Sequence, residues 1–408
     1  MNDWQTVELQ DIAVVERGKF SVRPRNDPKY FGGDIPFLQT GDVAGASGAI
    51  ISTYSQTLNK EGLKVSKYFP AGTLLITIAA NIGDVAEVGF GFACTDSLVA
   101  VQAKNGIDKN WLKFFLQTQK AYFESRATQN AQANINLQTI RPLPVDLPSL
   151  LEQTTIANLL STWDEAIDKA ERLIAAKEKL YSGLSKKLLF GNSTGDSSAS
   201  KSTRWFSVPE HWKIVKVGTI AKEVKTTNDV GDTIPVLSCT KYDGLVDSLS
   251  YFGKQVFSLD TSTYKMVSMG EFAYATNHIE EGSIGYQNLY DKGLVSPMYT
   301  VFKTGNTIYD SYLYKVLKTE TYRHIFEVNT SASVDRRGSL RWNEFSKLPI
   351  PLPPIEEQKR IAAILDTARR EIDLLKQQAD ALRRQKRGLM QKLLTGVWHI
   401  RFDKEVDK

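Results

Sequence analysis

Basic side chains crowd one short segment near the start of the sequence. The segment also holds glycine, proline and asparagine, which predict a loop. Its basic residues are Arg17, Lys19, Arg23, Arg25 and Lys29. Cations on a loop suit phosphate groups, so this segment is a candidate contact for a nucleic-acid backbone. In the second half of the chain the matching candidates are Lys222 and Lys225.

A second polar segment differs between the two halves of the chain. In the first half it is rich in amides, at Gln129, Asn130, Gln132, Asn134 and Asn136. In the second half it carries guanidinium groups, at Arg336, Arg337 and Arg341. Arginine can fork onto guanine O6 and N7, whereas asparagine and glutamine match adenine N6 and N7. Two similar scaffolds with different polar loops would read different bases; alternatively, these side chains are solvated surface residues.

Several segments resemble catalytic motifs, but each match is incomplete. Gly195 to Ser202 resembles a phosphate-binding loop but has Ser200 in place of the second glycine, within a serine-rich stretch that predicts a linker. Ser296 to Tyr299 differs by one residue from a Ser-Pro-Pro-Tyr tetrapeptide and lacks a glycine-rich cofactor loop, so we expect a turn. Glu223 and Lys225 after Pro209 only loosely echo a nuclease core. The dispersed histidines are expected to be structural: His211, His278, His324 and His399.

Composition sets broad limits. The chain has 408 residues and a formal net charge of +5, which is too weakly basic to identify a nucleic-acid-binding protein by itself. Its only cysteines, Cys94 and Cys239, stand apart, which excludes a disulfide framework and a cysteine-paired zinc site. The N-terminal residues lack a secretory pattern and no window approaches a membrane span, so we expect a cytoplasmic protein without membrane contact.

An internal repeat organises the chain. PSLLEQTTIANLLSTWDEAID from Pro148 returns as PPIEEQKRIAAILDTARREID from Pro353, an offset of 353 − 148 = 205 residues. Upstream, WQTVELQDIA from Trp4 resembles WKIVKVGTIA from Trp212. The chain is therefore one unit written twice. The predicted parts are two globular domains at 1–147 and 205–352, two long helices at 148–191 and 353–396, a flexible linker at 192–204, and a tail at 397–408.

The two helical segments share a heptad pattern. Apolar residues recur at alternate spacings of four and three without internal proline, which predicts long helices packed along a coiled-coil seam. The predicted seam residues are Ile156, Leu160, Trp163, Ile167, Ile174, Leu184, Leu188, Ile361, Leu365, Ile372, Leu375, Leu382, Leu389 and Leu393. The partner of each helix is expected to be the other copy, in antiparallel orientation. Heptads alone more commonly indicate a simple dimerisation coiled coil, and the recurrence of the helix after two similar globular parts favours a spacer instead.

The globular domains are predicted to be α+β. Strand-like runs such as LLITI (74–78) and SLVAV (97–101) accompany one amphipathic helix in each domain, at Lys109 to Ser125 and at Asp310 to Phe326. In the first of these helices, the aromatic residues at helical spacing are assigned to the core: Trp111, Phe114, Phe115 and Tyr122. The prolines before each long helix, such as Pro144 and Pro351, predict extended strips that end each domain.

These features together resemble the specificity subunit of type I restriction-modification systems, over essentially the whole chain. The most specific elements are the duplicated proline-then-helix segments, each closing in KLL-x-G, and GTLLITIAANIGDVAEV from Gly72 with its partner GEFAYATNHIEEGSIGY from Gly270. The resemblance implies two α+β target-recognition domains, joined by two long helices in an antiparallel coiled coil, that read a bipartite asymmetric site in double-stranded DNA.

The resemblance also implies a division of labour. Two methyltransferase subunits would dock on this chain, and motor/nuclease subunits would add translocation and cleavage. The chain itself would be non-catalytic and bind no cofactor or metal, with S-adenosylmethionine, ATP and magnesium used by its partners. Two alternatives belong to other classes. They are a coiled-coil scaffold that binds only proteins, and a self-sufficient methyltransferase or nuclease, which the missing cofactor motifs disfavour.

Overall fold

The computed structural model describes residues 4–20, 22–127, 134–191, 200–228, 234–330 and 339–400. The chain forms two compact units, and the first combines Met1–Glu171 with Gln377–Lys408. The second is continuous, Arg172–Lys376. Each unit thus contains one globular domain and part of both long helices. These units divide both long helices between them, and the linear division into domains and spacer helices stays a prediction.

Unit 1 is built on two sheets. The larger has the strand order β2-β10-β7-β8-β4 and the smaller β5-β3-β9-β6. In chain order the elements are β1 (Gln5–Glu8), α1 (Leu9–Ile12), β2 (Ala13–Arg17), η1 (Pro28–Tyr30), β3 (Phe31–Leu38), α2 (Thr40–Ala46), β4 (Ile50–Ile51), β5 (Gln56–Leu58), α3 (Lys60–Lys64), β6 (Tyr68–Phe69), β7 (Leu74–Thr77), β8 (Val85–Val88), β9 (Phe92–Cys94), β10 (Leu98–Ala103), α4 (Lys109–Thr118), α5 (Lys120–Ser125), α6 (Leu137–Ile140) and β11 (Pro144–Leu147).

The larger sheet of unit 1 has apolar side chains on both faces. Because successive strand residues point to opposite sides, Leu74 and Ile76 of β7 join a cluster with Trp111 of α4, whereas Leu75 joins a cluster with Leu38 and Phe92 of the smaller sheet. All four residues of β7 are buried. The continuous apolar run LLITI is thus explained by burial on both sides.

Unit 2 repeats the plan with smaller sheets. Its four-stranded sheet has the order β15-β22-β19-β20, and four two-stranded ladders surround it. The elements are β12 (Ser200–Ser202), β13 (Ser207–Pro209), β14 (Lys213–Lys216), α8 (Val217–Ile220), β15 (Ala221–Val224), β16 (Leu237–Thr240), β17 (Gly244–Asp247), α9 (Ser248–Phe252), β18 (Lys265–Ser268), β19 (Phe272–Ala275), η2 (Ile279–Glu281), β20 (Ile284–Tyr286), β21 (Lys292–Val295), β22 (Tyr299–Thr304), α10 (Asp310–Leu317), α11 (Glu320–Thr330), α12 (Trp342–Phe345) and β23 (Pro349–Leu352).

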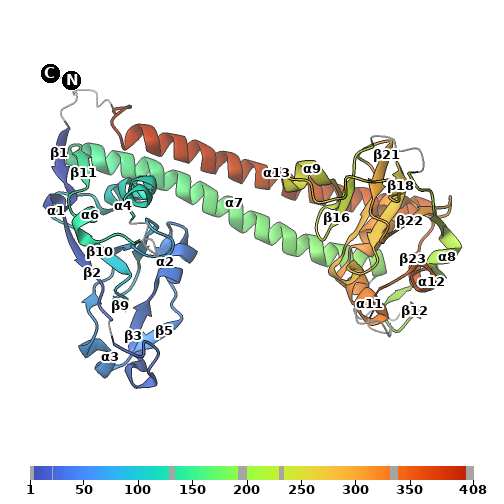
Figure 1. Cartoon of the computed structure of the whole chain (residues 1–408), viewed down its shortest axis with the longest axis horizontal. Coiled ribbons are helices and arrows are strands. Elements are labelled where there is room, and N and C mark those ends of the chain that lie inside the picture. The colour runs from blue at the N-terminus through green and yellow to red at the C-terminus, as the bar shows by residue number, and fades with distance from the viewer. Residues whose placement is uncertain are drawn as a thin grey trace. The chain divides into compact units, whose positions relative to one another are not determined.

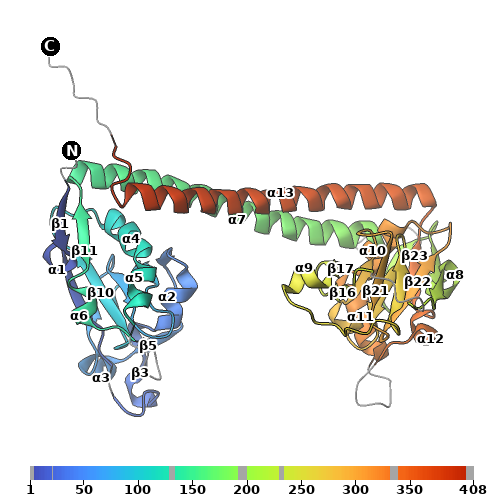
Figure 2. The same ribbon diagram turned by 45° about the horizontal axis from the view of Figure 1, so that its top comes forward.

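The proline-rich strips before the long helices are short strands in both units. β11 pairs antiparallel with β1, and β23 pairs antiparallel with β14. Figure 2 shows β1 and β11 side by side at the edge of unit 1. Each ladder joins an early strand of a domain to its last strand, which closes the domain immediately before its helix. Each strip lies in a ladder of only two strands, where proline, which lacks an amide donor, is tolerated.

A buried glutamine fastens each long helix to its own domain. Gln153 and Gln358 are 1% and 0% exposed and stand 205 residues apart. The Oε1 atom of Gln153 accepts the amide of Asp108, and that of Gln358 accepts the amide of Tyr309, at 2.9 and 2.7 Å. Each glutamine also donates to the carbonyl oxygen of a proline five residues earlier. The glutamine of the repeated EQ dipeptide is therefore a structural latch at the start of each long helix.

The long helices are α7 (Leu150–Phe190) and α13 (Ile355–Leu393), and they pack antiparallel within each unit (Figure 1). In unit 1 Asp164 pairs with Lys386 and Glu171 with Arg383. The residue numbers of the partners in α13 therefore fall as those in α7 rise, which is the mark of antiparallel helices. In unit 2 Glu178 pairs with Lys376, and the Arg369 guanidinium lies 4.4 Å from the ring centroid of Tyr181. The antiparallel coiled coil expected from the heptads is confirmed.

Burial along the helices follows the predicted seam. Every predicted seam residue is buried or half-buried. Leucines off the seam are exposed instead, with Leu159 at 40%, Leu173 at 45% and Leu374 at 59%. The 3.5-residue period of the sequence therefore identified the contact face of both helices.

Three details of the sequence-based prediction were wrong. Each amphipathic helix is two helices, because the chain leaves helical geometry at Gln119 and Lys318, which end α4 and α10. Phe123 rather than Tyr122 fills the core there, since Tyr122 is only half-buried. The last part of the predicted linker, Ser200–Ser202, forms β12 against β13. The remainder of that linker, residues 192–199, lies outside the described residues.

Candidate nucleic-acid interface

The basic segment of unit 1 runs from the end of β2 to η1, and its described residues between these elements form the loop predicted from the composition. Arg17 ends β2 and Lys29 lies within η1, and all five cations are exposed. Asp96 joins two of the cations, because its carbonyl oxygen accepts the Arg17 Nε–H and its carboxylate lies 3.2 Å from Nη2 of Arg25. Arg17 and Arg25, which are eight residues apart in the sequence, therefore both contact Asp96.

Lys29 has its own carboxylate partner. Its Nζ atom lies 3.1 Å from Oδ2 of Asp27 and 4.8 Å from the ring centroid of Tyr30. The backbone amide of Lys29 lowers the pKa of Asp27, and the hydrogen bond with Asp27 raises the pKa of Lys29. Both groups are therefore charged at neutral pH. Asp27 also caps η1, which fixes the turn from which Lys29 projects.

The amide-rich segment lies largely outside the described residues, which exclude Gln129, Asn130 and Gln132. Asn134 is described, is exposed, and forms an isolated antiparallel bridge with Ala79. Asn136 accepts the amide of Thr139 and caps α6. Helix capping therefore accounts for the carbonyl oxygen of Asn136, and its place among the base-reading amides stays a prediction.

In unit 2 the predicted cations lie on β15 and just beyond it. Lys222 is exposed and stands opposite Lys303 of β22, which adds a cation that the sequence reading missed. The Nζ atom of Lys225 lies 3.2 Å from Oε2 of Glu223. Arg341 is exposed at the N-cap of α12, while Arg336 and Arg337 lie outside the described residues. Lys222 and Lys303 thus lie on the β15–β22 ladder with Lys225 just beyond it, whereas Arg341 lies on a separate element.

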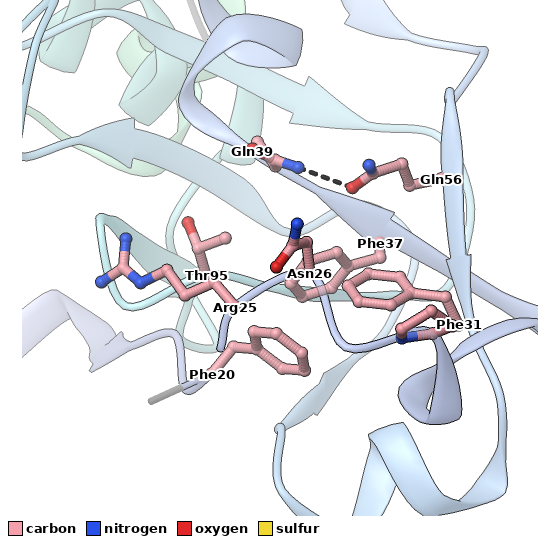
Figure 3. Close-up of a pocket in the computed structure, with 9 residues that line it drawn as sticks. Phe20, Arg25, Asn26, Phe31, Phe37, Gln39, Gln56 and Thr95 are labelled. Atoms are coloured by element: carbon pink, nitrogen blue, oxygen red, sulfur yellow. Dashed lines mark hydrogen bonds between the residues drawn. The ribbon is translucent and has the colours of Figure 1, made fainter. Parts of the chain in front are cut away.

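A pocket of about 430 Å³ opens beside the basic segment of unit 1 (Figure 3). It lies against the smaller sheet, and its lining combines aromatic rings with amides and one guanidinium group: Phe20, Arg25, Asn26, Pro28, Phe31, Phe37, Gln39, Gln56 and Thr95. Apart from Arg25, sequence reasoning missed these residues. The aromatic residues Phe20 and Phe31, flanking the cations, were the available signal.

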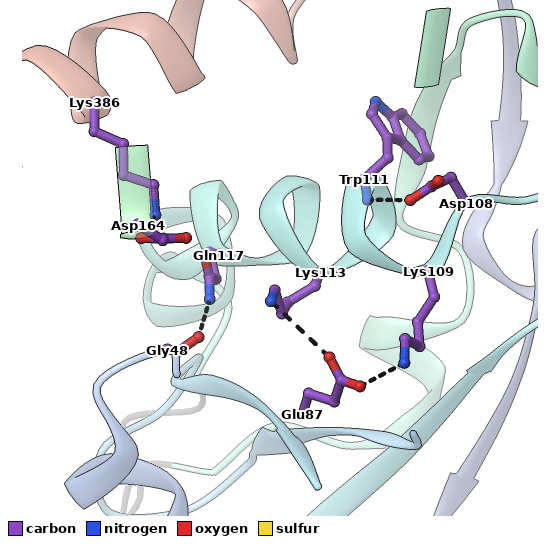
Figure 4. Close-up of polar contacts among 9 residues, drawn as sticks. All are labelled: Gly48, Glu87, Asp108, Lys109, Trp111, Lys113, Gln117, Asp164 and Lys386. Carbon is purple, nitrogen blue, oxygen red and sulfur yellow. Dashed lines mark hydrogen bonds and ion pairs between the residues drawn. The ribbon is translucent and has the colours of Figure 1, made fainter. Parts of the chain in front are cut away.

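A polar network in unit 1 joins α4 to the larger sheet and lies near the helix pair (Figure 4). Glu87 of β8 pairs with Lys109 and lies 4.0 Å from Lys113 of α4. Burial lowers the pKa of Lys113, opposed by the charges of Glu87 and Asp164. Lys113 and Lys386 both approach the ring of Phe114, at 5.0 and 4.8 Å. This network holds the domain carrying the basic segment in a fixed position on α7 and α13.

Each described histidine lies beside a glutamate. His211 lies 3.2 Å from Glu357, and His399 lies 3.4 Å from Glu152. His278, Glu280 and Glu281 place their potential ligand atoms within 4.8 Å of one another. His278 and Glu281 are exposed and lie 3.4 Å apart, so this group is a surface cluster of polar side chains. Within the described ranges, no helix is long and apolar enough to cross a membrane.

Comparison with known proteins agrees with this architecture of duplicated α+β units on paired helices. Residues 1–178 and 209–384 match the family described as type I restriction modification DNA specificity domain. The chain is 23% identical over 416 residues to the type I restriction enzyme MjaVIII specificity subunit of Methanocaldococcus jannaschii, with 98% of this chain and 94% of that protein covered.

Solved structures share the fold. The S subunit of a type I restriction-modification system from M. genitalium superposes with a TM-score of 0.56 at 14% identity, over 97% of each chain. A structure from work on complex assembly and conformational transition of the type I R-M system superposes with a TM-score of 0.58 at 16% identity, over 96% of this chain and 97% of that one. The family match covers most of the chain and defines a DNA-specificity protein. The chain belongs to the type I restriction-modification specificity subunit family.

Proposed function

We propose that this chain reads a bipartite, asymmetric site in double-stranded DNA, one half with each unit. One observation supports the proposal most strongly. The two copies of the repeat share the same framework, but the polar side chains on their surfaces differ. The Gln153 and Gln358 latches are equivalent, yet unit 1 presents the Arg17–Lys29 segment where unit 2 presents Lys222, Lys225 and Lys303. One framework with two polar surfaces supports two half-sites of different sequence.

Recognition would proceed in two stages. Exposed cations such as Arg23 and Lys222 would hold phosphates without regard to sequence, and this contribution weakens as salt rises. Side chains that reach base edges, with Asn134 and Arg341 as candidates among the described residues, would then select the sequence. The antiparallel helices would fix the length of the unread gap between the half-sites.

The chain would also serve as the scaffold for the catalytic subunits. Off-seam apolar side chains give α7 and α13 exposed hydrophobic surface beyond what their mutual packing uses, as at Leu180, which is 63% exposed, and Ile364, at 47%. Such surface suits helices of two methyltransferase subunits. We propose that this chain is non-catalytic and binds no cofactor, with S-adenosylmethionine, ATP and magnesium used by the methyltransferase and motor/nuclease partners.

Mapping of N6-methyladenine across a genome tests the proposal. Cells that hold the partner subunits should gain methylation at one split sequence when this chain is present and lose it when the chain is removed. Methylation that is independent of the chain would contradict the proposal.

A protein-only scaffold makes a different prediction from the proposed DNA reader. Binding of the purified chain to random duplex DNA should weaken steeply between about 50 and 200 mM salt if basic residues contact phosphates. An adaptor that binds only proteins would show no salt-sensitive DNA affinity.

A further inference from the structure

The pocket beside the basic segment of unit 1 has an aromatic floor. Phe20 and Phe37 are each 2% exposed, and their ring centroids lie 4.8 Å apart. Phe31 is half-buried, and its ring meets Phe20 edge-on at 5.7 Å. Figure 3 shows Phe20, Phe31 and Phe37 below Gln39 and Gln56 in the view. Because Phe20 and Phe37 are almost fully buried, Phe31 is the ring of this floor that offers an apolar face to a planar ring system.

Polar groups stand around this floor. Gln56 accepts a hydrogen bond from Nε2 of Gln39 at 2.6 Å, which occupies its oxygen and leaves the two N–H donors of its own amide for a ligand. The Thr95 hydroxyl oxygen is buried and has no hydrogen-bond partner among the described residues. Asn26 adds an exposed amide. The pocket thus offers both donors and acceptors to the edge of a planar ligand.

The charge of the pocket wall favours a ligand attached to phosphate. Arg25 lines the pocket, and its Nη2 atom is held 3.2 Å from Oδ1 of Asp96. Arg23 and Lys29, on either side of Arg25 in the sequence, are exposed. One segment therefore supplies a wall of the pocket and the cations that suit a backbone running past its mouth.

We infer that this pocket receives one nucleobase that leaves the stack of the bound DNA. The base would lie against Phe31, with its hydrogen-bonding edge toward the exposed amides of Gln56 and Asn26. This recognition would add sequence selectivity at one position of the half-site read by unit 1. The inference rests on the proposed function, because it requires that unit 1 bind DNA. Proteins that read unstacked bases combine stacking on apolar rings with hydrogen bonds to the base edge.

The test uses the full-length chain and duplexes that carry its mapped target site. Each position of the site is replaced in turn by 2-aminopurine, whose fluorescence rises when the base leaves the stack. Binding should brighten one position of the half-site read by unit 1. The variants Phe31→Ala and Gln56→Leu should abolish that signal and weaken binding to the target about tenfold. Their affinity for random duplex should stay unchanged, because the basic residues remain.

Tyr54→Ala is the matched control, since Tyr54 is an exposed aromatic residue of unit 1 that does not line the pocket. It should leave the fluorescence signal intact. A chain that shows no preference for the mapped site would refute the proposed function itself. Site-specific binding without a brightened position, or brightening that survives both pocket variants, would overturn the pocket inference alone. Binding of free adenosine without such a signal would also overturn it and identify a small-molecule site.

Discussion

The Nζ atom of Lys386 lies 2.5 Å from Oδ1 of Asp164, and the repeat replaces this ion pair with a cation–π contact. Adding 205 to 164 gives Arg369, and subtracting 205 from 386 gives Tyr181, whose ring lies 4.4 Å from the Arg369 guanidinium. The next pair, Glu171 with Arg383, recurs with its charges exchanged as Lys376 with Glu178. Equivalent positions on the helices thus remain in contact although their chemistry has diverged.

The Lys386–Asp164 pair should contribute modestly to the stability of unit 1. Lys386→Met should lower the free energy of unfolding by about 1 kcal/mol, because the lysine side chain is 14% exposed while Asp164 is 46% exposed and partly solvated. A double-mutant cycle with Asp164→Asn in urea unfolding measures the coupling. Lys169→Met is the control and should change little, since Lys169 and its partner Glu165 are 76% and 70% exposed. Zero coupling would contradict a stabilising pair.

Gln358, the buried latch of unit 2, should contribute more to stability than the Lys386–Asp164 pair. Gln358→Leu removes the acceptor of the Tyr309 amide and two donated hydrogen bonds, to the carbonyl oxygens of Thr307 and Pro353. Because the Tyr309 amide would be left without a partner, we expect a loss of about 2–3 kcal/mol. Hydrogen exchange at the Tyr309 amide should accelerate. Gln377→Leu, at an exposed helix position, should leave that exchange unchanged. Slow exchange in the Gln358 variant would show that the latch is dispensable.

Gly18 should be needed for the shape of the basic segment. A Cβ atom at Gly18 would overlap the carbonyl oxygen of Thr95 and lie 2.6 Å from Sγ of Cys94. Gly18→Ala should therefore destabilise unit 1 by about 1–3 kcal/mol and weaken binding to DNA, because it displaces the strand end that carries Arg17 and Lys19. Gly41→Ala is the control, since nothing lies within 4 Å of its added Cβ. Equal stability and DNA affinity in the two variants would contradict this close packing.

Cys94 should make stability fall at alkaline pH. Burial raises the pKa of Cys94 from 9.0 to about 12, so the thiol stays protonated in the folded chain while the unfolded chain ionises. Its contribution is therefore complete below pH 9.0 and is lost as pH rises toward about 12. Urea unfolding at several pH values should show a steeper decline for the unchanged chain than for Cys94→Ala. Parallel declines would mean that the thiol is not buried.

Local patterns in the sequence were sufficient to predict the long helices. The pocket could not be predicted in this way, because it is formed by residues that lie far apart in the sequence. The heptads of α7 and α13 repeat every few residues, so Ile156 and Leu365 could be assigned to the seam without a structure. The break at Lys318 depends on how α10 and α11 pack, which no local periodicity records. The pocket brings together Phe20, Gln56 and Thr95, and their proximity depends on strand order in the smaller sheet and its neighbouring loops.

The central claim is that the two units read separate half-sites. Exchange of one globular domain tests this claim most directly. Residues 1–147 would be replaced by the corresponding domain of the M. jannaschii relative, with both long helices kept, and N6-methyladenine would be mapped across the genome. If each unit reads its own half-site, one half of the methylated sequence should change, while the other half and the gap between them stay the same. Loss of both halves together, or an unchanged methylated sequence, would contradict it.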